Sequence, residues 1–168
     1  MNKKCIYFVE GSCEKQLIDA LKQQPAKLIP GKVKILNPIQ RRLSKSVLLT
    51  IDPGSIVVFV YDTDKPEVEI LHENIALLAN LCVNIKVVHL MQVLTIEDEL
   101  VRSTDVKSAP ELTKSRGTSA FKSDFCRLTP QSCRTLLDRH HLNADKLWNT
   151  PSPAPYNRIS RNRAIAVK

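Results

Sequence analysis

Acidic residues follow two apolar segments of the chain, at positions where strands would end. Glu10 comes directly after the apolar residues 6–9, and Asp62 and Asp64 follow the continuous apolar run 55–61. In an open α/β sheet, ligands bind outside the carboxyl ends of the strands. Carboxylates gathered there repel one another and form the hard oxygen site that suits Mg²⁺ or Mn²⁺. The alternative is that these acids only cap the helices that follow. We therefore take phosphate chemistry as the leading hypothesis.

Alternating strand and helix patterns must position these acids. Strands are predicted at residues 4–9, 32–36, 55–61 and 84–90, and helices at 14–22 with Ser12 as N-cap, at 39–51, after Pro66 and from Thr95. The order βαβαβαβ with short connections predicts an α/β fold, a Rossmann-like, doubly wound and mostly parallel sheet flanked by helices. Parallel strands place their carboxyl ends at one edge, which would bring the acids together.

The pattern changes after the fourth strand. Residues 1–102 are expected to form the α/β core, and residues 103–150 a loop and helical extension that completes the domain. Within that extension, the polar segment 103–120 is predicted to be a mobile loop, and Thr129 with Pro130 predicts the start of a helix. Residues 151–168, rich in proline and arginine, are expected to form a basic tail that is disordered on its own.

The net charge of +8 is unevenly distributed. Residues 51–110 carry ten acids and four Lys/Arg, whereas the flanking segments are strongly basic. This layout suits a metal site that holds a polyanion, although a solvated basic surface is the simpler alternative. The arginines expected to contact a nucleic-acid backbone are Arg41, Arg42, Arg158, Arg161 and Arg163.

The apolar runs and the cysteines bear on where the protein acts. No apolar run approaches the roughly 20 residues that span a bilayer, and the basic, apolar start ending in Glu10 predicts a strand rather than a signal peptide. Five cysteines, with no CxxC, favour reduced thiols and a cytoplasmic location. A zinc site is the less favoured alternative, and it would use Cys126, Cys133, His140 and His141.

Glu10-Gly11 after one apolar strand, followed by Asp62-x-Asp64 after another, resembles the TOPRIM domain. That domain occurs in topoisomerases, bacterial primases, small RNA-processing nucleases and the nuclease half of OLD-family defence proteins. The resemblance covers about residues 4–100 and implies a compact α/β fold that acts on phosphodiesters with Mg²⁺. It implies that Asp62 and Asp64 are metal ligands, and that Glu10 is a ligand or a general acid/base.

Two later segments are similar to the OLD-like branch. The acidic stretch that begins at Glu97 looks like the segment that supplies further metal ligands there, with Asp98 or Glu99 as a possible addition to Glu97. The segment 121–125 looks like the branch's lysine segment, in which Lys122 would meet charge developing on the phosphate. An ordinary helix start and a solvated lysine are the alternatives. The chain lacks the GxxxxGK[ST] loop of the OLD ATPase, which implies a stand-alone nuclease or an ATPase on another chain.

The resulting hypothesis is a Mg²⁺-dependent TOPRIM nuclease that cleaves RNA such as tRNA, or DNA. The branch that it resembles suggests a role in phage defence or a toxin-like system, with a regulatory partner chain; a homo-oligomer is left open. The rival is a non-catalytic TOPRIM-like module that binds nucleic acid or a partner protein. A response-regulator-like phosphoacceptor is a third reading, but it would need an acid pair where Gly11 and Ser12 stand.

Overall fold

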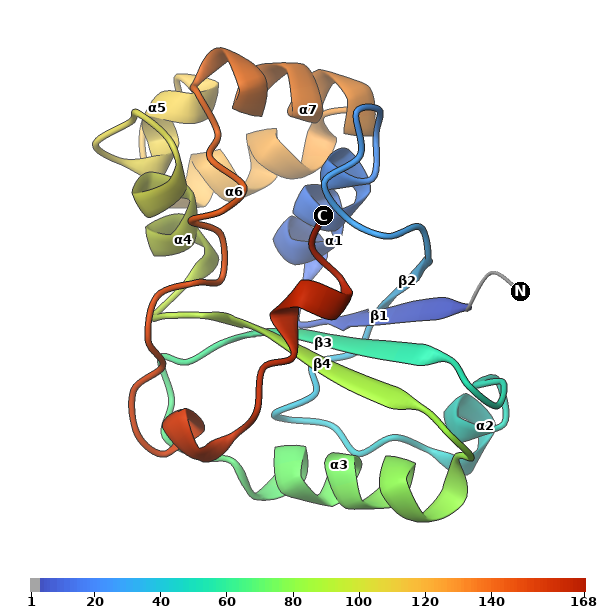
Figure 1. Ribbon diagram of the computed structural model, residues 1–168. Coiled ribbons are helices and arrows are strands. Elements are labelled where there is room, and N and C mark those ends of the chain that lie inside the picture. Colours follow the sequence, from blue (N-terminus) through green and yellow to red (C-terminus); the bar gives the residue numbers. More distant parts are fainter. Residues whose placement is uncertain (1–3) are drawn as a thin grey trace.

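A sheet of four parallel strands organises the computed structural model, which describes residues 4–168 (Figure 1). The strands are β1 (Cys5–Val9), β2 (Lys32–Ile35), β3 (Ile56–Asp62) and β4 (Lys86–Gln92). Their order is β2-β1-β3-β4, and every neighbouring pair is parallel. The prediction of an α/β fold with a parallel sheet is confirmed, and all four predicted strands are present within about two residues of their expected bounds.

Helices cover both faces of the sheet (Figure 1). One layer contains α1 (Ser12–Leu21), α4 (Ile96–Ser103), α5 (Ala109–Thr113), α6 (Thr118–Arg127) and α7 (Pro130–Arg139); the other contains α2 (Lys45–Leu48) and α3 (Glu69–Leu81). Successive strand residues alternate between the two cores, so that Tyr7 packs toward the first layer and Phe8 toward the second. Both cores are buried, as the continuous apolar strands require. Nowhere in residues 4–168 is a helix both long enough and apolar enough to cross a membrane.

Local sequence signals fix where several helices begin. Thr95 and Asp98 form a reciprocal capping box at the start of α4. At α7 the Thr129 side chain accepts a hydrogen bond from the Ser132 amide, and Pro130 occupies the first turn, as predicted. The cap of α1 differs from the prediction, because Gly11 is the N-cap and Ser12 is the first helical residue.

The predicted helix over residues 39–51 is wrong except for α2. The Asn74 side chain on α3 binds the preceding segment: its Oδ1 accepts from the Leu43 amide at 2.8 Å, and its Nδ2 donates to the carbonyls of Pro38 and Arg41. These tertiary hydrogen bonds use backbone groups that a helix would need for itself. The apolar spacing therefore serves an irregular segment that packs over α3.

The predicted mobile loop at 103–120 is also wrong. It contains α5 and the first turn of α6, and Ala109 and Leu112 are buried in the core. Ser115 donates a 2.6 Å hydrogen bond to Asp124 of α6. A few apolar residues are enough to fold this polar segment, because α4 and α6 provide the surface on which they pack.

Residues 151–168 pack against the sheet instead of extending into solvent as the expected disordered tail would. The segment contains two short 3₁₀ helices, η1 (Tyr156–Arg158) and η2 (Arg163–Ile165). The Arg161 carbonyl accepts from the His89 amide of β4 at 2.8 Å, and the buried Tyr156 donates from its hydroxyl to the Lys65 carbonyl. Val167 forms an isolated antiparallel bridge with Leu28. The segment therefore covers the β4 edge of the sheet.

Arg161 should matter for stability, although it is one of the arginines expected to bind nucleic acid. Its guanidinium donates to the carbonyl of Trp148 at 2.9 Å, to that of Thr150 and to the Ser152 hydroxyl. Arg161→Ala would leave these acceptors unpaired and should cost about 1–3 kcal/mol of unfolding free energy. Thermal unfolding should show a fall in Tm of several degrees. The exposed Arg158, changed to Ala, is the matched control and should leave Tm unchanged; an equal effect of both changes would contradict this assignment.

Candidate active site

Glu10 and Asp62 meet at the carboxyl edge of β1 and β3. The strands pair in register from Cys5 with Ile56 to Val9 with Val60. Beyond that register the Glu10 amide donates to the Val60 carbonyl, and the Asp62 amide donates to Glu10 Oε2, both at 3.1 Å. The Glu10 carboxylate thus joins the two strand ends. Asp62 Oδ1 is buried and has no hydrogen-bond partner.

Glu14 adds a carboxylate that the sequence analysis did not single out. It lies in the first turn of α1, is only 5% exposed, and approaches the backbone of Gly11 so closely that a Cβ there would lie 3.1 Å from Glu14 Oε2. Burial, together with the charges of Glu10 and Glu97, raises the pKa of Glu14 to about 7. In the sequence it is only an acid four residues after Glu10, a spacing that does not reveal its burial.

Asp62 is the electrostatic centre of this group. Its pKa is raised from an ordinary 3.8 to about 9, first by burial and then by the charges of neighbouring carboxylates. Those neighbours, in order of effect, are Glu14, Glu10, Asp64 and Glu97. The structure therefore brings the predicted acids Glu10, Asp64 and Glu97 within electrostatic range of Asp62, and Asp64 itself is exposed.

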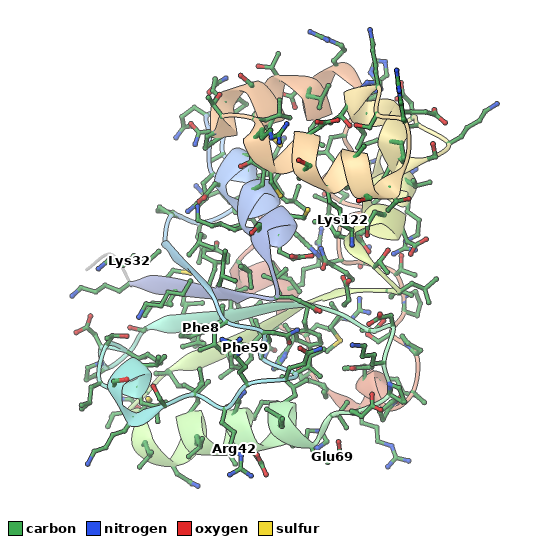
Figure 2. The ribbon with its side chains drawn as sticks, turned by 180° about the vertical axis from the view of Figure 1, so that it is seen from behind. Phe8, Lys32, Arg42, Phe59, Glu69 and Lys122 are labelled. Atoms are coloured by element: carbon green, nitrogen blue, oxygen red, sulfur yellow. The ribbon has the colours of Figure 1, made fainter. Side chains whose placement is uncertain are left out.

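Lys122 reaches this group from α6. Its Nζ lies 3.1 Å from Oε1 of Glu97 on α4, and the ion pair raises the pKa of Lys122. The lysine side chain is 57% exposed and that of Glu97 is 14% exposed, so the pair lies at the mouth of the site. Figure 2 shows Lys122 on the α6 side of the sheet, opposite Arg42. Two residues chosen from separate sequence segments thus contact each other.

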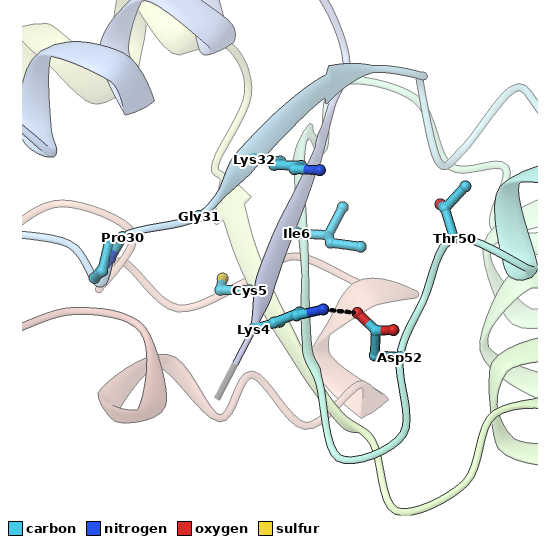
Figure 3. A pocket seen from close by; sticks show the side chains of 8 residues that line it. All are labelled: Lys4, Cys5, Ile6, Pro30, Gly31, Lys32, Thr50 and Asp52. Atoms are coloured by element: carbon cyan, nitrogen blue, oxygen red, sulfur yellow. Dashed lines mark ion pairs between the residues drawn. The ribbon is translucent and has the colours of Figure 1, made fainter. Parts of the chain in front are cut away.

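Several of these groups line a hollow of about 330 Å³, although Asp64 and Glu97 are not among its lining residues. Its lining includes Glu10, Cys13, Glu14, Asp62, Lys122 and Cys126. A larger hollow of about 420 Å³ lies at the amino ends of β1 and β2, where Lys4 pairs with Asp52 at 2.8 Å (Figure 3). That second hollow is lined by Pro30, Gly31 and the stems of lysines and lacks clustered acids, so we place the chemistry in the first.

Gln92 is a further polar residue that the sequence analysis missed. It is the last residue of β4 and lies directly beside Asp62 in the strand register. The side chain is fully buried, and neither its amide oxygen nor its amide nitrogen has a partner. A buried amide without partners is costly. Gln92 therefore adds unpaired polar atoms beside Asp62, at the carboxyl ends of the strands.

Asp98 and Glu99, the possible additions to the site, have structural partners. Asp98 caps α4. Glu99 is fully buried; its Oε1 accepts from the Trp148 amide and its Oε2 from Arg102 at 2.8 Å. Both carboxylates are occupied in holding α4 and residue 148 in place.

The candidate nucleic-acid-binding arginines are not gathered at this site. Arg42 pairs with Glu73 of α3, on the other face of the sheet (Figure 2). Arg161 and Arg163 donate to backbone carbonyls, including those of Trp148 and Leu147. The two remaining arginines, Arg41 and Arg158, are exposed.

The carboxylates fit a hard divalent cation in chemistry and charge, but they are not arranged as a finished ligand set. Among residues 4–168, no three His, Cys, Asp or Glu side chains form a group that could hold a metal ion. Asp62 Oδ1 is buried without a partner, and burial and the neighbouring charges raise the pKa of Asp62. A bound cation would lower the cost of the charge on this carboxylate. Glu97 would first have to release Lys122.

No family model, curated protein or solved structure matches the chain. The resemblance to TOPRIM domains therefore stays a prediction, and the interpretation of the site depends on the geometry described above.

Replacing Asp62 by Asn should stabilise the protein when a chelator removes divalent cations. Because the folded state raises the pKa of Asp62 from 3.8 to about 9, the folded protein binds this proton more tightly than the unfolded chain does. The contribution of Asp62 to stability therefore falls as pH rises between those values. Thermal unfolding should show a Tm gain for Asp62→Asn of several degrees at neutral pH, shrinking toward pH 4. Asp64→Asn, at the exposed neighbour, should change Tm little; a lower Tm for Asp62→Asn would contradict the electrostatic picture.

Proposed function

We propose that this protein is a Mg²⁺-dependent nuclease of the TOPRIM type, most similar to the OLD-like branch, that hydrolyses phosphodiester bonds of nucleic acid. The observation that supports it most is the convergence of Lys122 with the carboxylates in one hollow at the carboxyl edge of β1 and β3. Acids that would hold cations, next to a lysine that would face phosphate, form an arrangement suited to phosphoryl chemistry.

Glu10, Asp62, Asp64 and Glu97 are the residues that would hold the cation, and Mn²⁺ could replace Mg²⁺. When bound, such an ion would polarise the phosphodiester and lower the pKa of water. The chain contributes the frame: the Asp62 amide fixes Glu10 through a 3.1 Å hydrogen bond. Burial, followed by the charges of the neighbouring carboxylates, raises the pKa of Asp62, and a bound cation would offset both costs.

Glu14 and Lys122 have complementary roles in this proposal. Glu14 is buried and lines the hollow beside Asp62, which places a carboxylate where a general base would be needed. Lys122 would leave Glu97 and donate to the phosphate as negative charge develops there. Its 57% exposed side chain has the freedom to make that exchange.

The substrate is proposed to be RNA such as tRNA, or DNA. The exposed Arg41 and Arg158 remain available to contact a phosphate backbone. All five cysteines are free, in keeping with a reducing, cytoplasmic location. The same proposal includes a role in phage defence or a toxin-like system, with an ATPase or regulatory partner chain or a homo-oligomer. These parts rest on the resemblance to the OLD-like branch.

A cleavage assay tests the proposal directly. The protein is incubated with labelled tRNA, single-stranded DNA and duplex DNA, with Mg²⁺, Mn²⁺ or a chelator. Asp62→Ala should lower cleavage by about two orders of magnitude or more, because even residues that only support a metal ligand contribute about 10–100-fold. Asp52→Ala, at the opposite edge of the sheet, is the control and should retain activity. Cleavage that survives Asp62→Ala rules out this site, whereas binding without any cleavage would favour the non-catalytic module.

Metal binding can be measured without a substrate. A ligand that binds only the folded state at about 100 times its Kd adds about 2.7 kcal/mol of stability. Mg²⁺ should therefore raise the Tm of the parent protein by several degrees. Asp62→Asn should lose most of that gain, while Asp52→Asn should keep it. An equal Mg²⁺ response in all three proteins would place the ion elsewhere.

A further inference from the structure

Two thiols contact each other at the edge of the candidate active site. The Sγ atoms of Cys13 and Cys126 lie 3.3 Å apart, although the residues are 113 positions apart in the sequence. Cys13 is 8% exposed on the first turn of α1, and Cys126 is half-buried near the end of α6. Two free thiols in contact need only a small approach to form a disulfide, for which the sulfurs come to about 2.05 Å.

The pair is built into the same hollow as the acids. Cys13 directly precedes Glu14, and Cys126 lies one helical turn after Lys122 on the same face of α6. Cys13 Sγ also lies 3.9 Å from the Lys122 carbonyl oxygen. A covalent bond here would therefore join the helix that carries Lys122 to the helix that carries Glu14.

We propose that Cys13 and Cys126 are a redox-sensitive pair, in which a peroxide forms a reversible disulfide that clamps α6 to α1. The effect of this clamp on activity rests on the proposed nuclease function, but formation of the bond does not. Within residues 4–168, the other three cysteines, Cys5, Cys82 and Cys133, make no thiol contact of this kind.

The chemistry balances with peroxide as the oxidant. The more accessible Cys126 sulfur attacks one peroxide oxygen, the O–O bond breaks, and a sulfenic acid forms with release of water. The Cys13 sulfur then attacks the Cys126 sulfur, the S–O bond breaks, and a second water leaves as the disulfide forms. Two thiols lose two electrons in total, and the peroxide gains them. An external thiol reverses the reaction by exchange.

The clamp should inhibit the enzyme. In the structure Lys122 is paired with Glu97, and the proposed reaction requires that the lysine leave this pair. Such an exchange needs freedom in the turn of α6 that carries Lys122. A disulfide one turn away would restrict that freedom, so the oxidised protein should retain the fold and lose cleavage.

The experiment treats the full chain with hydrogen peroxide, quenches free thiols, and maps disulfides by mass spectrometry of peptides. The Cys13–Cys126 bond should form in the parent protein and in Cys82→Ser, whose changed residue lies on the other face of the sheet. It should not form in Cys13→Ser or Cys126→Ser. Closing so long a loop should raise Tm by roughly 5–10 °C in the parent and in Cys82→Ser only, and a reducing thiol should reverse the rise.

The outcomes separate the two proposals. A bond between Cys126 and Cys133, or no bond at all under peroxide, would overturn the redox pair. If the reduced protein cleaves nucleic acid, oxidation should lower the cleavage rate by about 10-fold or more, because a misplaced catalytic group loses rate steeply, and reduction should restore it. Unchanged cleavage in the oxidised form would overturn the clamp. If the reduced protein cleaves nothing, the nuclease proposal fails, and the disulfide map with the Tm shift still decides whether the thiol pair forms.

Discussion

The cost of burying Asp62 among other carboxylates, at the carboxyl ends of the strands, is the constraint on which the rest of this site depends. Burial contributes most to the cost of its charge, and Glu14, Glu10 and two further acids add to it. The fold tolerates this because the Asp62 amide donates to Glu10 and because Lys122 pairs with Glu97. Both compensations are local and modest. The apolar sheet buried on both faces is what supplies the stability to hold such a group together.

The charged groups of the site come from separate elements. Glu10 follows the end of β1, Asp62 ends β3, Glu14 lies on α1, and α4 and α6 supply Glu97 and Lys122. The arrangement therefore exists only in the folded chain, because these residues are far apart in the sequence. α5 lies between α4 and α6 in the chain, and so between the elements that carry the two partners of the ion pair.

The strands and the position of the main acids were predictable because continuous apolar runs and strand-end acids are local signals. Glu14 and Gln92 were missed because their importance comes from burial beside Asp62, which no spacing reveals. The helix expected at 39–51 failed because Asn74, on a distant helix, binds the backbone there. Arg161 and Arg163 lie in a segment whose composition predicts a solvated basic tail. Their guanidinium groups nevertheless donate hydrogen bonds to backbone carbonyls. In each failure a tertiary partner outweighed the local pattern.

The segment that covers the β4 edge has a consequence for synthesis on the ribosome. β4 is complete at Gln92, whereas the Arg161 carbonyl that pairs with the His89 amide follows much later in the chain. During that interval the β4 edge presents unpaired backbone groups, which are a template for association with another nascent chain. Until residues 151–168 have been synthesised and have packed on β4, this strand is exposed to pairing with another chain. The rate of their synthesis therefore sets how long that exposure lasts.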